Sequence, residues 1–454
     1  MQNRRSTLLE GPVWKGMVLF AVPIFLGNLF QQFYNTFDSW CVGNFIGEDA
    51  LAAVSSSGSL IFMMVGFFSG VAMGAGVIMA RYFGAGDTDS LKKAIHTDVA
   101  LGLATGALLT VLGVMFTPVV LGWMGTPEEV MPQSVSYFRY FFCGAIFTVM
   151  YNVFVGILHA LGDSRTPLYY LILASFINVG LDLLFVAVLG LGVGAAAMAT
   201  TISQGLSAVL CAIRLMRLKT DYRLQIKQIR FHKKSLQQII RYGLPAGVQN
   251  SVIAFANVVV QSNINSFGKA AMAGCGSYSK IEGFAFLPIT CFTQALATFV
   301  GQNLGAGNVK RVKKGVGFGI LCPALIAELI GVTVFLLAPK LIGFFNDDPV
   351  VVDFGTRHMR TIAPFYFLLA TTHCISSVLR GAGKTTLPMI VMLAVWCVFR
   401  VSYITVAVQY INRLETVSWA YPITWTISSI ILVICFFKTD WLHHFERREE
   451  KQRA

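Results

Sequence analysis

The segment Asn28–Ser39, NLFQQFYNTFDS, lies in an apolar run that is long enough to cross a membrane. Its polar residues recur every three or four positions, so on a helix they form one continuous stripe. These residues are Asn28, Gln31, Gln32, Asn35, Asp38 and Ser39. Because a carboxylate at membrane depth costs about 2.5–3.5 kcal/mol, the stripe is expected to face a bundle interior or a water-filled cavity. The alternative is that Asp38 meets water at the outer membrane interface.

The composition is that of an integral membrane protein. Of 454 residues, 55% are hydrophobic and 13% are charged, which is about half the charged share of roughly 25% in soluble proteins. The formal net charge of +13 needs no nucleic-acid partner, because 27 of the 35 Lys and Arg residues fall in alternate connecting segments and the two terminal regions. This bias predicts that both termini are cytoplasmic. The N-terminus lacks a small-residue cleavage site and is not expected to be a signal peptide.

Twelve apolar runs of roughly 20 residues or more predict an all-α fold with twelve transmembrane helices. The predicted spans are 14–44, 50–80, 94–121, 133–158, 167–190, 193–217, 236–265, 271–301, 315–338, 355–379, 387–411 and 417–437. The first span is unusually long and contains Pro23, so a bend is expected there.

An internal repeat divides these spans into two halves. The tripeptide GAG at Gly84–Gly86 recurs 221 residues later, at Gly305–Gly307. The same shift of 221 residues takes Pro167 to Pro388. Two pseudo-symmetric six-helix lobes that enter the membrane from the same side are therefore predicted. The predicted domains are an N-lobe (1–217), a cytoplasmic linker (218–235), a C-lobe (236–440) and a cytoplasmic tail (441–454).

A second acid occurs in the first half, within span 167–190. Asn178 and Asp182 are four residues apart and so share one helix face. Two carboxylates in one low-dielectric pocket cannot both ionise cheaply, so Asp38 and Asp182 together predict a site for H⁺ or Na⁺. The alternative is a structural contact between Asp182 and a neighbouring helix.

The second half lacks this acid pair but holds other ionisable residues inside its spans. These are Lys280, Glu282, Glu328, His373 and Arg400. Glu282 could attract a cationic substrate or pair with Arg400. Met63 and Met64 could line a soft apolar cavity that accepts many shapes. We find no nucleophile or metal-ligand grouping, so neither an enzyme nor a resident cofactor is expected.

Several motifs together resemble multidrug and toxic compound extrusion (MATE) transporters, over essentially the whole chain. They are QQFYNTFDSWCVG at 31–43, ARYFGAGD at 80–87, LGDSRTPLY at 161–169, NVGLD at 178–182, GAAAMATTISQ at 194–204 and FVGQNLGAGN at 299–308. The resemblance implies a V-shaped pair of lobes of the MATE/MOP type. It also implies export of organic, often cationic compounds, driven by inward H⁺ or Na⁺.

Within the family, the resemblance is to the DinF-like branch, because no acid follows Gly243-Leu244-Pro245 as in NorM-like members. It implies a cation-coupling site made of Asp38, Asp182, Asn178, Thr200 and Asn152, with Na⁺ possible at the first four. Residues expected at the substrate cavity are Gln31, Gln32, Tyr34, Asn35, Met63, Met64 and Glu282. Pro23 is expected to bend its helix.

These features predict a monomeric multidrug antiporter for small organic compounds in a bacterial or archaeal cytoplasmic membrane. The alternative is a flippase for lipid-linked oligosaccharides, which a basic central cavity would favour. Only Lys280 and Arg400 could supply such a charge.

Overall fold

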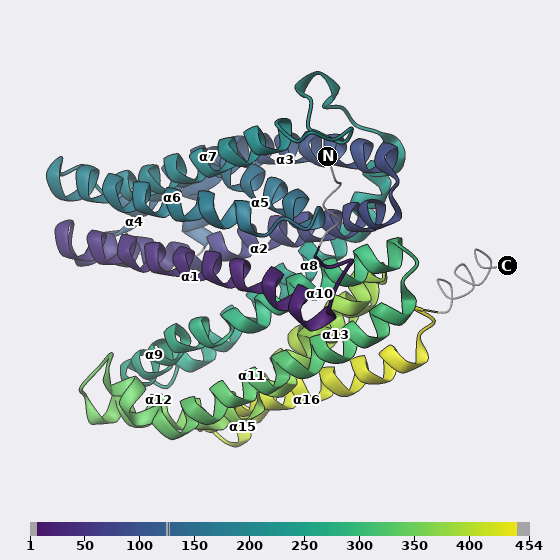
Figure 1. Ribbon diagram of the computed structural model, residues 1–454. Coiled ribbons are helices and arrows are strands. Elements are labelled where there is room, and N and C mark those ends of the chain that lie inside the picture. Colours follow the sequence, from purple (N-terminus) through teal and green to yellow (C-terminus); the bar gives the residue numbers. More distant parts are fainter. Residues whose placement is uncertain (1–6, 124–125, 127, 443–454) are drawn as a thin grey trace. The chain divides into compact units, whose positions relative to one another are not determined.

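The computed structural model describes residues 7–123, 126 and 128–442, without the side chains of residues 48, 49, 51–53, 55–63 and 123. Helices make up almost all of this part of the chain, and no strand occurs in it (Figure 1). In the first half the helices are α1 (Val13–Phe45), α2 (Glu48–Ala85), α3 (Thr88–Trp123), α4 (Met131–Cys143), α5 (Ala145–Ala160), α6 (Arg165–Asp182), the π-helix η1 (Leu183–Val188) and α7 (Gly194–Met216). A 3₁₀ turn, η2 (Ile226–Gln228), precedes the second half.

The second half repeats the pattern with more breaks. Its helices are α8 (Lys233–Asn265), α9 (Lys269–Ala285), α10 (Leu287–Gly305), α11 (Val309–Gly343), α12 (Pro349–Ile362), the 3₁₀ turn η3 (Ala363–Phe365), α13 (Tyr366–Gly381), α14 (Thr386–Met392), the π-helix η4 (Leu393–Phe399), α15 (Arg400–Tyr410) and α16 (Leu414–Lys438).

The predicted membrane spans are confirmed. In the part of the chain that the structure describes, 11 helices are long and apolar enough to cross a membrane, and the pair α4 and α5 makes up to 12. This pair is bent by 45° at Gly144, within the predicted span 133–158. A Cβ atom at Gly144 would lie 2.3 Å from the Thr201 side chain, so the bend brings α7 against bare backbone.

The chain packs as two compact units. One unit is Val22–Gly247, and the other combines the described residues of Met1–Ala21 with those of Val248–Ala454. The helices α1 and α8 each contribute to both units. The domain limits expected from the sequence, at 217/218 and 235/236, stay a prediction.

The repeat in the sequence is also a structural repeat. The shift that relates the two GAG motifs takes the bounds of α5 onto those of α13. Each is a central helix of its unit, since α5 packs on α2, α3 and α7, and α13 packs on α10, α11 and α16.

The turns repeat as well. Three pairs of glycines with left-handed backbone angles are related by this same shift: Gly47 and Gly268, Gly86 and Gly307, Gly162 and Gly383. Positive φ favours glycine because glycine has no Cβ atom. This requirement explains why the last residue of each GAG motif, Gly86 and Gly307, is a glycine.

The first of the two GAG turns joins α2 to α3. Gly86 ends α2 with φ 69°, and its N–H donates to the carbonyl of Phe83 at 3.2 Å. The next residue, Asp87, accepts the backbone N–H of Ser90 at 3.0 Å on its Oδ1 and so caps the start of α3. This hydrogen bond lowers the pKa of Asp87, so the cap weakens only when pH falls through that lowered value.

Small residues let α2 and the start of α8 approach closely within one unit. A Cβ atom on Gly74 would lie 2.4 Å from Gly243 Cα, and one on Gly70 would lie 2.6 Å from the Ala246 carbonyl oxygen. On the α8 side, a Cβ atom on Gly247 would lie 2.8 Å from the carbonyl oxygen of Phe67. Paired small-xxx-small motifs of this kind allow backbone contact between membrane helices.

We predict that Gly74→Ala destabilises the protein, because its new methyl group has only backbone atoms to displace. Overpacking of this kind costs about 1–3 kcal/mol. The measurement is the thermal unfolding midpoint of the detergent-purified protein. Gly276→Ala is the matched control, since apart from the backbone of its own helix no described atom lies within 4 Å of a Cβ there. An unchanged midpoint for Gly74→Ala would contradict the close approach.

Candidate cation-binding site

Three helices of one unit bring a hydroxyl and two carboxyl groups together. The Thr200 hydroxyl on α7 donates to Asp38 Oδ2 on α1 at 2.9 Å. The Asn178 side chain on α6 donates through Nδ2 to Thr200 Oγ1 at 3.5 Å. The carboxyl groups of Asp38 and Asp182 lie close enough to interact directly. The structure thus brings together four of the five residues predicted for cation coupling.

The oxygen atoms of this cluster are poorly supplied with donors. Asp38 Oδ1, Asn178 Oδ1 and both oxygens of Asp182 are buried and find no hydrogen-bond donor among the described residues. Asp38 is only 9% exposed and Asp182 is fully buried. Buried oxygens without donors are costly unless a proton or a cation satisfies them. Carboxylate, amide and hydroxyl oxygens are also the ligands that hard cations prefer. The oxygens of this cluster therefore fit either H⁺ or Na⁺.

The local sequence explains how α6 presents its two polar residues. Its buried positions recur at helical spacing and include Leu171, Ala174, Ser175, Asn178 and Asp182. The apolar members of this stripe pack into the unit and carry the polar ones with them. The π-helix η1 begins directly after Asp182. Such π segments widen the helix and are frequent at functional sites.

The residues around the cluster include three that the sequence reasoning missed. Tyr137 on α4 lies close enough to both acids to interact electrostatically with them, and so does Cys41 on α1. Gln204 on α7 donates to the Tyr34 hydroxyl at 2.9 Å, with both side chains buried. Gln204 follows Thr200 by one helical turn, a spacing that could have revealed it. Tyr137 gives no such signal, since only packing brings α4 to the site.

The fifth coupling residue lies apart from this network. Asn152 on α5 accepts a hydrogen bond from the Ser69 hydroxyl at 3.0 Å and donates to the Thr148 carbonyl at 2.8 Å. Its side-chain oxygen and nitrogen are therefore both engaged away from Asp38. The structure does not bring Asn152 into hydrogen bonding with the acid cluster.

The residues predicted for the substrate cavity differ in exposure. Gln31 and Gln32 are half-buried, Asn35 is exposed and Tyr34 is buried. Met64 packs against a cluster that includes Phe138 and Phe142. The Met63 side chain lies outside the described residues. The role of these residues in a cavity stays a prediction.

The other unit holds a buried cation of its own. Arg400 is 1% exposed and donates to Thr424 Oγ1 at 2.8 Å and to Asn257 Oδ1 at 3.3 Å. Its guanidinium lies 4.9 Å and 4.8 Å from the rings of Trp396 and Tyr421. Aromatic faces stabilise a cation in such an arrangement.

The second-half acid predicted for substrate binding, Glu282, has a different principal partner. The Tyr278 hydroxyl donates to Glu282 Oε1 at 2.8 Å, and Arg400 acts on this carboxylate only through its charge. Lys280 is exposed, with its Nζ 5.6 Å from the centre of the Phe345 ring. His373 is half-buried, edge-on to Trp396 with ring centres 5.6 Å apart.

The described helices form a polytopic repeat, and its first half holds a buried pair of acids. A family model described as MatE matches residues 23–184 and again residues 245–406. The chain therefore belongs to the MatE family of membrane transporters, the MATE family that the motifs predicted, and it is not an enzyme. The two matches fall on the two halves of the repeat.

Known proteins resemble the chain over nearly its full length. It is 27% identical over 440 residues to "Probable multidrug resistance protein YoeA" of Bacillus subtilis, covering 94% of each chain. It is 29% identical to "Probable multidrug resistance protein YpnP" of the same organism, over 86% of this chain and 87% of that one. A solved outward-facing MATE transporter of the MOP superfamily covers 98% of this chain and 100% of its own, with a TM-score of 0.90 at 23% identity. This last likeness concerns the fold.

We predict that Thr200→Val weakens cation binding at the acid cluster. Valine keeps the shape of threonine but removes the donor to Asp38, and a hydrogen bond to a charged group contributes about 1.5–3 kcal/mol. The expected loss of affinity is about tenfold or more for the cation that binds. Titration with Na⁺ and with acid can be followed through the fluorescence of Trp40, which is 51% exposed and two residues beyond Asp38. The Trp40→Phe variant, which lacks this indole, shows which part of the fluorescence change comes from Trp40.

The matched control for this titration is Thr201→Val. The Thr201 hydroxyl donates instead to the Tyr140 carbonyl at 3.4 Å, away from the cluster. Equal affinities for both valine variants would contradict the role of Thr200.

Proposed function

We propose that this chain exports organic compounds, often cationic, in exchange for H⁺ or Na⁺ that binds at Asp38 and Asp182. The observation that carries the proposal is the group of four buried oxygens at these acids and at Asn178 that find no donor in the described part of the chain. A proton or Na⁺ entering this cluster would lower the cost of keeping two carboxylates in a low-dielectric interior. The free energy gained when the ion binds would then depend on the ion concentration on the side of the membrane to which the cluster is open.

The link from the ion to the substrate is proposed to run through α1. This helix holds both Asp38 and Pro23, and Pro23 is buried inside the same continuous helix. Proline removes one backbone hydrogen bond and crowds the preceding turn, so a helix bends most easily there. Binding of the ion at Asp38 would change the position of α1 and thereby bend it at Pro23. The substrate residues predicted on the same helix, Gln31 and Asn35, would move with it.

The relatives support multidrug export over the flippase alternative, since several bear the name of multidrug resistance proteins. We extend this activity to the present chain as part of the proposal. The chain is proposed to work as a monomer of the DinF-like branch, in a cytoplasmic membrane and with both termini on the cytoplasmic side. The cluster in the Val22–Gly247 unit supports the branch, and the excess of Lys and Arg in alternate connecting segments supports the orientation.

The decisive experiment is ethidium efflux under separately imposed pH and Na⁺ gradients. We expect Asp38→Asn to reduce efflux to the level of cells without the protein, because the amide cannot bind the coupling ion. The wild type should follow one of the two gradients and thereby identify the ion. Asp353→Asn, at an exposed acid of α12, is the control and should export normally.

Two results would overturn the proposal. Normal efflux by Asp38→Asn would remove the acid pair from coupling. Efflux by the wild type that ignores both gradients would remove ion exchange.

We predict that Pro23→Ala folds normally but exports more slowly, because alanine restores the backbone hydrogen bond and stiffens α1. The rate of efflux and the amount of folded protein are measured together. Pro118→Ala is the control, since Pro118 is an exposed proline inside α3. A wild-type rate for Pro23→Ala would show that bending at this residue does not limit transport.

A further inference from the structure

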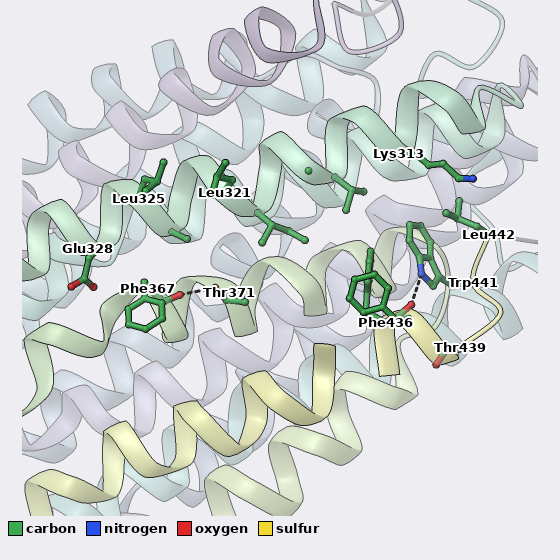
Figure 2. Close-up of a pocket in the computed structure, with 15 residues that line it drawn as sticks. Lys313, Leu321, Leu325, Glu328, Phe367, Thr371, Phe436, Thr439, Trp441 and Leu442 are labelled. Carbon is green, nitrogen blue, oxygen red and sulfur yellow. Dashed lines mark hydrogen bonds between the residues drawn. The ribbon is translucent and has the colours of Figure 1, made fainter. Parts of the chain in front are cut away.

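A groove of about 830 Å³ lies on the second-half unit, far along the chain from the acid cluster. One wall is α11 from Lys313 to Glu328, and α13 contributes Phe367 (Figure 2). The end of α16 and the residues after it close the other side with Phe436 and Trp441. The volume lies within the range of about 300–1,000 Å³ that is usual for sites of drug-sized molecules.

The groove opens on a helix face with the composition of a lipid-facing surface. On α11, the exposed large side chains recur at helical spacing and include Leu321, Leu325, Leu329, Val332 and Leu336. Leu321 and Leu325 also line the groove, with exposed fractions of 62% and 61%. A molecule dissolved in the bilayer can therefore reach the groove sideways.

One end of this apolar groove carries the carboxyl group of Glu328. Glu328 and Lys313 lie about 22 Å apart along α11, at the rise of an α-helix, so that lysine cannot neutralise it. Glu328 makes no ion pair with any described residue, and its Oε2 is buried without a donor. The nearby Thr371 hydroxyl donates to the Phe367 carbonyl at 2.7 Å and is not available (Figure 2). An acid at membrane depth is expected to have a partner.

Glu328 has a structural role, but that role does not need a charge. The backbone N–H of Phe367, at the start of α13, interacts with the Glu328 carboxylate. In the other repeat the residue that matches Phe367 is Ile146, and it donates its N–H to the neutral hydroxyl of Thr110 on α3 at 3.3 Å. A hydroxyl thus performs the same task at the start of α5. The contact with Phe367 therefore leaves one carboxyl oxygen of Glu328, Oε2, without a donor among the described residues.

The far end of the groove is aromatic. The Trp441 indole donates to the Phe436 carbonyl at 2.9 Å, and the two rings are 4.9 Å apart. Flat rings provide a large apolar contact area. A molecule that combines a positive charge with apolar rings would match both ends.

We propose that this groove binds an amphipathic organic cation from the bilayer, with its charge at Glu328 and its apolar body along α11. The inference rests on the proposed function, since it takes its ligand from the same substrate class. It assigns to the chain a second binding site, reached from the membrane and separate from the acid cluster.

The test uses a photoactivatable triphenylphosphonium and its neutral analogue of the same shape, with the full-length protein in lipid vesicles and no ion gradient. Labelled peptides are located by mass spectrometry. We expect the cation to label α11 and the segment around Trp441, and the neutral analogue to label them weakly. Glu328→Gln should reduce labelling by more than about tenfold, as loss of one partner of a charge pair does.

A second variant tests the groove without touching its charge. Gly317→Leu should block labelling by filling the groove, because apart from the backbone of its own helix no described atom lies within 4 Å of a Cβ at this lining position. Gly343→Leu is the matched control on the same helix, with equally open space but outside the groove. It should label like the wild type.

The outcomes separate this site from the proposed transport cycle. Asp38→Asn should label normally even where it has lost efflux, which would support a distinct site. Equal labelling by the neutral analogue, or unchanged labelling of Glu328→Gln, would overturn the proposal in favour of a groove for lipid chains. Labelling that Gly317→Leu leaves intact would overturn the location.

Discussion

A carboxylate inside a membrane must be neutralised or paired, and this constraint organises the Val22–Gly247 unit around Asp38 and Asp182. The cost of an uncompensated charge at membrane depth is large compared with the few kcal/mol that hold a domain together. Helices α1, α6 and α7 meet at these acids, and α4 adds Tyr137 nearby. The hydrogen bond from Thr200 compensates only one of the four carboxylate oxygens. The oxygens that remain without a donor among the described residues are the basis on which we propose the cluster as a site for a mobile cation.

The second repeat shows that the fold does not require this deficit. At the positions that match the two acids, it has Val259 and Tyr403. Its central helix α13 nevertheless matches α5 residue for residue in its bounds. The helix arrangement of this scaffold therefore does not depend on acids at these two positions. The acids of the first repeat are additions to that scaffold.

The two units also differ in the charged groups that they bury. In the second unit the cation is a side chain, Arg400, which two aromatic rings and two polar side chains hold in place. In the first unit the buried oxygens have no such resident partner among the described residues. The same topology thus holds a buried arginine with its partners in one repeat and, in the other, an acid pair that we propose to bind an exchangeable cation. Glu328, at the groove of the second unit, resembles the acid pair in having a buried carboxyl oxygen without a donor among the described residues.

The sequence by itself determined the helical membrane fold, the twelve spans, the repeat and the family, because apolar length, glycine turns and motif spacing are local properties of the chain. It also singled out Asp38, Asn178 and Asp182, since polar residues in an apolar run stand out. Only the tertiary structure decided which residues meet. It joined Thr200 to Asp38 across 162 residues and turned Asn152 toward Ser69. It also brought Tyr137 to the acids and formed the groove beside Glu328. Such contacts depend on how helices bend and pack, as at Gly144, and no periodicity within one helix contains that information.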